Sequence, residues 1–168
     1  DLNQVVARAM TMLDDRLESA HAEIVRGPLP TVEGDPTLLT ALFQNLIGNA
    51  VKYHDPERPP RIEIHAERQG ADWLCTVADN GIGIDRQYAE RIFTIFQRLH
   101  LRDKYGGTGI GLALCRKILE FHRGKIWLAE KDDPDAPGAT FAFLIPDHAE
   151  LRSDTTSDFA ETADTREH

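Results

Sequence analysis

Two pairs of short extended segments, the first with alternating hydrophobicity, limit the folds open to this chain of 168 residues. In the first pair, every second residue is apolar over residues 62–66, and a polar link leads to a second alternating run over residues 73–79. The second pair joins residues 125–130 to residues 139–145 through a stretch rich in Asp and Pro. The alternation with period two on both sides of the short link in the first pair is typical of a β-hairpin, and we expect the second pair to form a hairpin too. Two hairpins argue against an all-parallel sheet, in which single strands would alternate with helices.

Three segments with helical periodicity complete the pattern. Apolar residues recur at three- and four-residue steps over residues 4–20, and a second helix begins with Asp35 as N-cap and ends near Tyr53. A third long helix is expected over residues 109–122, with Gly124 as its C-cap. A short helix and two extended segments are expected at residues 86–92, 22–26 and 31–33. Together these elements predict an α+β fold, a two-layer α/β sandwich in which a mixed sheet carries about three main helices on one face.

Two glycine-rich loops are the first candidates for a binding site. Residues 79–83 read Asp-Asn-Gly-Ile-Gly after a strand, and residues 106–112 read Gly-Gly-Thr-Gly-Ile-Gly-Leu before a helix. Backbone N–H groups at a helix N-terminus can bind a phosphate. Neither loop fits the dinucleotide-binding or the P-loop pattern, because Leu112 stands where the P-loop needs lysine. An ordinary turn would explain Gly81 and Gly83, but four glycines in the second loop favour phosphate binding, since glycine is costly at the start of a helix.

A polar stripe on the second helix is the next candidate. Asn45, Asn49 and Lys52 are spaced by four and three residues, so they share one helix face beside the apolar face. Amide oxygens can bind Mg²⁺, and a lysine can pair with phosphate. Taken alone, the stripe is explained equally well by a solvated helix face.

Asp79 stands at the end of an apolar strand, just before two glycines. A carboxylate there can accept a hydrogen bond from an exocyclic amine such as that of adenine. The competing explanation is that Asp79 only initiates a turn, which is a common use of this residue.

Five short motifs, taken in order, resemble the boxes that mark the ATP-binding domain of sensor histidine kinases. They are the N box, the first glycine box, the F box, the second glycine box and a weaker last glycine motif, at residues 44–53, 79–83, 93–99, 107–113 and 138–141. Their order and spacing match from about residue 1 to 146. The resemblance implies the Bergerat fold shared with gyrase, Hsp90 and MutL ATPase domains. Residues 96–100, followed by Tyr105, are similar to kinases of phytochrome-like photoreceptors, whereas Thr94 and Ile95 depart from the commoner acidic-Pro pair of the F box.

The resemblance implies a site for ATP and Mg²⁺. It assigns the adenine amine to Asp79, the metal to Asn49 with Asn45, and catalytic roles to Asn45, Lys52 and Arg98. Residues 93–107 would form a mobile lid over the nucleotide. The residues that it assigns to ATP binding are Asn45, Asn49, Lys52, Tyr53, Asp79, Gly81, Gly83, Ile84, Arg98, Gly107, Thr108, Gly109, Ile110, Gly111, Leu112 and Thr140. Asn45 stands where gyrase-type ATPases carry a glutamate base, and its amide cannot take a proton, which favours phosphoryl transfer over hydrolysis.

The phosphoacceptor histidine of such kinases has no match in this chain. Residues 54–59 superficially resemble the acceptor motif, but Pro56 and Pro59 would break the helix that carries it. The resemblance therefore implies a catalytic domain that donates the γ-phosphoryl group of ATP to a histidine on a separate dimerisation domain, with a response regulator as the indirect partner. We expect the isolated domain to be monomeric, because the dimer contacts belong to that other domain.

Two alternatives stay open. The chain could be a nucleotide-binding regulatory or docking module without transferase activity, although its nearly intact boxes argue against this. It could also be an ATPase or an anti-sigma serine kinase of the same superfamily, which Asn45 and the F box disfavour.

Charge separates a folded body from a tail. Residues 147–168 hold seven acidic and two basic residues, so they carry −5 of the net charge of −9 and leave −4 for residues 1–146. We therefore expect a catalytic domain over 1–146 and a flexible acidic tail over 147–168. The acidity argues against nucleic acid and against direct membrane contact. Two cysteines without paired spacing fit buried thiols in a reducing, cytoplasmic setting, whether the parent kinase is soluble or membrane-anchored.

Overall fold

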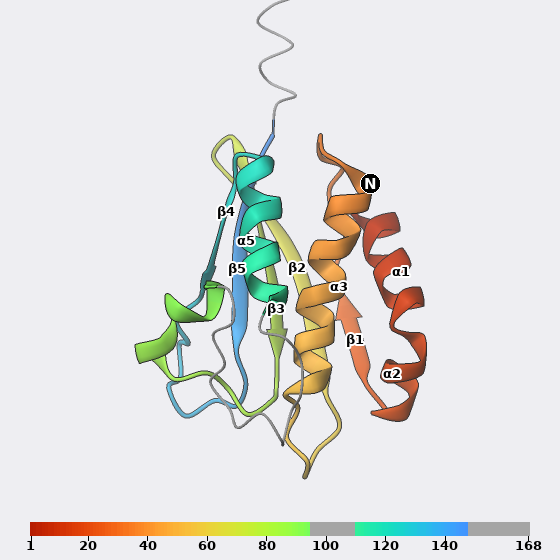
Figure 1. The fold of residues 1–168 in the computed structure, drawn as a ribbon, viewed down its shortest axis with the longest axis vertical. Helices are drawn as coiled ribbons and strands as arrows, with labels where there is room; N and C mark the ends of the chain where they lie inside the picture. Colours follow the sequence, from red (N-terminus) through yellow and green to blue (C-terminus); the bar gives the residue numbers. More distant parts are fainter. Residues whose placement is uncertain (95–109, 148–168) are drawn as a thin grey trace, which may run out of the picture.

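Five strands form one mixed sheet in the order β1-β2-β3-β5-β4 (Figure 1). The computed structural model describes residues 1–94 and 110–147. β1 pairs with β2 in parallel, and the other neighbouring strands are antiparallel. The strands are β1 (Glu23–Arg26), β2 (Arg61–Gln69), β3 (Asp72–Asp79), β4 (Lys125–Leu128) and β5 (Thr140–Pro146). Both expected hairpins are thus confirmed.

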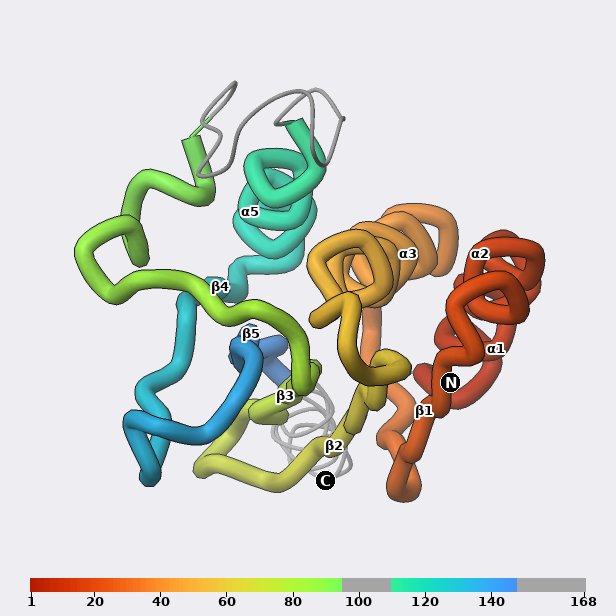
Figure 2. The backbone as a smooth tube through the Cα atoms, turned by 90° about the horizontal axis from the view of Figure 1, so that it is seen from below, coloured from red at the N-terminus to blue at the C-terminus, as the bar shows by residue number. Residues whose placement is uncertain are grey.

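The helices lie on one face of this sheet, as the end-on view of Figure 2 shows. They are α1 (Leu2–Met12), α2 (Asp14–Ser19), α3 (Pro36–Lys52), α5 (Gly111–Phe121) and two short 3-10 helices, η1 (Arg86–Tyr88) and η2 (Arg91–Phe93). α3 packs between α1 and α5. The two-layer α/β sandwich predicted from the sequence is therefore confirmed. No helix within the described residues is long and apolar enough to cross a membrane.

The core lies between α3, α5 and the sheet. Ile62 and Ile64 of β2 are fully buried, as the alternation predicts. Phe43 of α3 meets Phe143 of β5 edge to face, with ring centroids 5.7 Å apart. Such contacts fix the distance between α3 and the sheet, and so position the polar face of α3.

α3 begins as the sequence predicts. The Asp35 carboxylate accepts hydrogen bonds from the backbone N–H groups of Thr37 (2.9 Å) and Leu38 (3.0 Å), and Pro36 occupies the first turn. These bonds satisfy N–H groups that have no partner inside the helix. The helix ends at Lys52, one residue before the expected end.

Four expectations about local structure were wrong. The single helix expected over 4–20 is interrupted at the buried Leu13, and Asp14 and Asp15 begin α2, where acidic side chains are favoured by the helix dipole. Residues 31–33 form no strand. The short helix expected over 86–92 is replaced by two 3-10 turns, η1 and η2.

The fourth concerns the end of α5, where the left-handed residue is Arg123, with φ of 60°, and not Gly124. Gly124 donates its N–H to Leu119 (2.7 Å), which closes the helix end. A Cβ on Gly124 would lie 2.0 Å from the carbonyl oxygen of Leu144, so glycine is needed there for close approach to β5.

Candidate functional site

Asp79, the last residue of β3, is held by the loops on both sides of it. Its Oδ1 accepts hydrogen bonds from the backbone N–H groups of Gly81 (2.9 Å) and Ala139 (3.2 Å). The N–H of Asp79 in turn donates to the carbonyl of Ala139 (2.9 Å). Within the described residues, Oδ2 accepts no hydrogen bond. One carboxylate oxygen therefore orients the side chain, and the other can accept a bond from a ligand.

Burial raises the pKa of Asp79 above its ordinary value, because the charged form loses hydration. The hydrogen bonds from Gly81 and Ala139 and the positive charge of Lys131 act in the opposite direction. A carboxylate that is partly desolvated and held in a fixed orientation is typical of a binding site.

Two glycines allow the backbone to close around Asp79. Gly138 has φ of +86°, and a Cβ on it would lie 1.8 Å from the carbonyl oxygen of Asp79. A Cβ on Gly81 would lie 2.4 Å from the carbonyl oxygen of Tyr53, which also accepts the N–H of Ile82 (3.1 Å). Gly81 thus has a structural reason to be glycine, since it joins the loop after β3 to the end of α3. The expected approach of Gly81 to a bound base is not tested by this contact.

The polar face of α3 turns toward the start of α5. The side-chain NH₂ of Asn45 donates to the carbonyl of Ala41 (2.8 Å), so its Oδ1 points away from its own helix. That Oδ1 would be 2.8 Å from a Cβ built on Gly111, the first residue of α5. The side chain of Asn49 is half-buried and makes no hydrogen bond within the described part of the chain. These two amide oxygens suit Mg²⁺, a cation that prefers oxygen ligands.

The structure brings most of the described site residues to one end of the sandwich. Lys52 and Tyr53 lie side by side at the end of α3, with the Lys52 ammonium 5.1 Å from the Tyr53 ring centroid. Thr140 pairs with Ala78, next to Asp79. Gly83 has φ of +76°, and Ile84 is half-buried against the core.

The start of α5 holds three further predicted residues. Ile110 caps the helix and is exposed, Gly111 is its first residue, and Leu112 packs against the core. Four predicted site residues lie outside the described part of the chain: Arg98, Gly107, Thr108 and Gly109.

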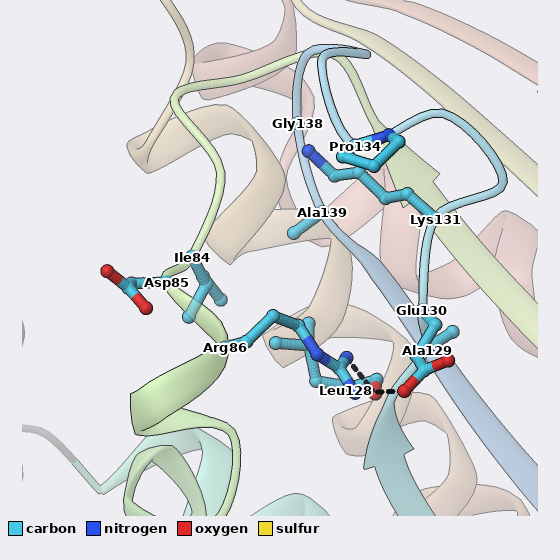
Figure 3. Close-up of a pocket in the computed structure, with 10 residues that line it drawn as sticks. All are labelled: Ile84, Asp85, Arg86, Leu128, Ala129, Glu130, Lys131, Pro134, Gly138 and Ala139. Carbon is cyan, nitrogen blue, oxygen red and sulfur yellow. Dashed lines mark hydrogen bonds and ion pairs between the residues drawn. The ribbon is translucent and has the colours of Figure 1, made fainter.

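A pocket of about 410 Å³ lies beside this site, between the loop after β3 and the connection from β4 to β5 (Figure 3). Ile84, Lys131, Gly138 and Ala139 are among its lining residues. Sequence reasoning missed Ala139 and Lys131. The glycine motif around residue 138 drew attention to this stretch, and Lys131 is a single base in a run of acidic residues, but neither pattern reveals contact with a distant strand.

The comparisons with known proteins agree with this geometry. The family model "Histidine kinase-, DNA gyrase B-, and HSP90-like ATPase" matches residues 34–149. Cyanobacterial phytochrome A of Nostoc sp. is 50% identical over 146 residues, which cover 87% of this chain and 19% of that protein. The phytochrome-like protein Cph1 of Synechocystis sp. is 49% identical over the same shares of each chain. The chain thus spans about a fifth of the length of these curated relatives.

Solved structures give the same result. The mycobacterial sensor histidine kinase MprB matches with a TM-score of 0.73 and 25% identity, covering 87% of this chain and 94% of that one. The catalytic domain of histidine kinase ThkA matches with a TM-score of 0.71 and 27% identity, covering 87% and 92%. The chain therefore belongs to the histidine kinase-, DNA gyrase B- and HSP90-like ATPase family, as a domain of the histidine-kinase type with relatives among phytochrome-like kinases.

Proposed function

We propose that this domain binds Mg²⁺-ATP and donates the γ-phosphoryl group to a histidine on a separate dimerisation domain of a two-component sensor kinase. The observation that carries the proposal is the Asp79 carboxylate at the end of β3, which is fixed through Oδ1 and leaves Oδ2 for a ligand. An adenine amine is a donor that this acceptor suits.

Different residues of the site would bind the base, the metal and the phosphates. Asp79 accepts the adenine amine, and the turn at Gly81 to Gly83 brings backbone close to the base. Asn45 and Asn49 hold Mg²⁺ through their amide oxygens, and Lys52 supplies a positive charge for a phosphate. Mg²⁺, when bound, neutralises charge on the phosphate oxygens.

The residue at position 45 bears on the reaction type. The amide of Asn45 cannot accept a proton from water, so this face of α3 offers no general base for hydrolysis at that position. Phosphoryl transfer to a protein acceptor needs positioning and charge neutralisation more than a base. This supports a kinase over an ATPase.

The partners are proposed from the relatives. A solved structure shows histidine kinase ThkA in complex with a response regulator protein, TrrA. By analogy, we place this domain beside a dimerisation domain that bears the acceptor histidine, in a cytoplasmic kinase that signals to a response regulator.

A reconstituted transfer reaction tests the proposal. The chain is mixed with ATP labelled in the γ-phosphoryl group, Mg²⁺ and a separately produced dimerisation hairpin, and acid-labile label on the hairpin is measured. We expect label on the hairpin with the wild-type chain. At limiting ATP, Asp79→Asn should reduce this label by about tenfold or more. Steady phosphate release without labelled hairpin would instead indicate an ATPase, and nucleotide binding without either product would indicate a docking module.

A further inference from the structure

Lys131 is a basic residue in a connection whose other charged residues are acidic. It lies in the connection between β4 and β5, and is half-buried. Its ammonium donates a hydrogen bond to the carbonyl of Ala136 (2.6 Å). The same Nζ would be 3.7 Å from a Cβ built on Gly83. Figure 3 shows its side chain extending toward Gly138, along one edge of the pocket.

This position places a positive charge beside the loop that holds Asp79. Gly83 is two residues beyond Gly81, whose N–H binds the carboxylate. The carbonyl of Gly138, next to Ala139, would be 3.2 Å from a Cβ on Gly83. The loop is therefore contacted on one side by the end of α3, through Tyr53, and on the other by the β4–β5 connection that carries Lys131 (Figure 2).

Several other charged and titratable groups lie on the elements around Asp79. These titratable groups are Lys52, Tyr53 and His54 at the end of α3 and just after it, Arg61 and Glu63 on β2, Asp85 beyond the loop, and Lys131, Asp132, Asp133 and Asp135 in the β4–β5 connection. Burial raises the pKa of Asp79, and the hydrogen bonds from Gly81 and Ala139 and then the charge of Lys131 lower it. None of the ion pairs formed within residues 1–94 and 110–147 includes Lys131, so no direct carboxylate partner neutralises it there.

We propose that Lys131 is a positioning residue of the nucleotide site, whose ammonium group behind the Gly83 turn adds to the hydrogen bonds from Gly81 and Ala139 in favouring the carboxylate form of Asp79, the form that can accept the amine of the base. This inference rests on the proposed function, in which Asp79 binds adenine. A protonated Asp79 would have an O–H in place of a free acceptor oxygen, and the bond to the amine would weaken. Lys131 thereby extends the pH range over which the site binds nucleotide.

Three substitutions separate the charge of Lys131 from its other roles. Lys131→Met removes the positive charge and the hydrogen bond to Ala136. Lys131→Gln keeps a hydrogen-bond donor without the charge. Lys131→Arg keeps the charge and the donor. Lys125→Met is the matched control, because Lys125 lies over Trp127 and pairs with Leu144 toward the other end of β5. The Asp79 carboxyl is followed by carbon-13 NMR during a pH titration without nucleotide, and its signal is assigned with Asp79→Asn.

We expect the Asp79 carboxyl to titrate at higher pH in the Met and Gln variants than in wild type, and at the wild-type pH in the Arg and Lys125→Met variants. Unchanged titration in Met and Gln would overturn the proposal, and so would a change in Met that Gln does not share, because that would assign the effect to the bond with Ala136. ADP affinity is measured by calorimetry across the same pH range and compared with Asp79→Asn. As the pH is lowered, the affinity of the Met and Gln variants should begin to fall at a higher pH than that of wild type. If the titration shifts while ADP affinity does not follow it, Lys131 acts on Asp79 but the adenine role of Asp79 is wrong.

Discussion

The backbone N–H of Ala139 donates a hydrogen bond of 3.2 Å to the carboxylate Oδ1 of Asp79, although the two residues are 60 positions apart in the sequence. The N–H of Asp79 donates to the carbonyl of Ala139 in return. The residue just before β5 therefore holds the side chain of Asp79 directly. Because the same residues pair the strands and orient the carboxylate, stability and binding are linked at this point.

Asp79→Asn should separate these two properties. Burial raises the pKa of Asp79, so the folded protein binds this proton more tightly than the unfolded chain, and the contribution of Asp79 to stability falls as pH rises through the raised pKa. An asparagine keeps an acceptor for Gly81 and Ala139 without the buried charge. We expect the variant to have an equal or higher Tm than wild type at pH 7, with the difference shrinking on acidification. A Tm at pH 7 that drops well below wild type would contradict this reading of the carboxylate.

Gly138→Ala should damage both the fold and the site. The new Cβ would lie 1.8 Å from the Asp79 carbonyl oxygen, at a φ of +86° that side chains disfavour. We expect a loss of about 2 kcal/mol or more in the free energy of unfolding, measured with urea, and weaker ADP binding.

Gly70→Ala is the matched control for that substitution. Gly70 also has a positive φ, of +62°, but a Cβ there meets nothing within 4 Å. The Gly70→Ala variant should lose only about 1 kcal/mol in its free energy of unfolding, because of backbone strain, and should keep its ADP affinity. Equal effects of the two substitutions would show that the contact with Asp79 does not matter.

Asn49→Ala should remove the magnesium dependence of nucleotide binding. If Asn49 holds Mg²⁺ together with Asn45, its loss should abolish most of the gain in ADP affinity that Mg²⁺ gives, and leave metal-free ADP binding nearly unchanged. Calorimetry with ADP at several Mg²⁺ concentrations measures this gain. Gln44→Ala, on the same helix, is the control and should keep it. A full magnesium effect in the Asn49 variant would exclude this residue from the metal site.

The two cysteines should be unreactive in the folded protein. Burial raises the pKa of Cys75 and of Cys115 to about 12, and both are free thiols. Since the thiolate is the reactive form, iodoacetamide at pH 8 should label neither residue in buffer and both in urea. Rapid labelling of either thiol in buffer would show that the core opens more readily than this packing implies.

Local signals in the sequence predicted the frame of the molecule. The N-cap Asp35, the two hairpins and the polar face of α3 each depend on residues that are close together in the chain, so their patterns are visible in it. Gly124 shows the limit: its role is to approach Leu144 on a distant strand, and the left-handed conformation falls on Arg123 instead. The sequence pattern had instead predicted Gly124 as the C-cap of the helix.

The same limit applies to the site. Asp79, Asn45 and Asn49 could be named from their motifs, and the structure places them at one end of the sandwich. Lys131 could not be found in this way, because its approach to the Asp79 loop depends on how β4 and β5 are connected in space. Arg98 and Gly107 to Gly109 lie outside the described residues, and their roles stay predictions.

The most direct test of the central claim compares ADP with inosine diphosphate, which carries a carbonyl where ADP has its exocyclic amine. Calorimetry measures both ligands, with Mg²⁺, on wild type and on Asp79→Asn. A hydrogen bond to a charged acceptor is worth about 1.5–3 kcal/mol, so wild type should bind ADP at least about tenfold more tightly, and Asp79→Asn should lose most of this preference. Equal binding of the two nucleotides by wild type would contradict the assignment of Asp79 to the adenine amine.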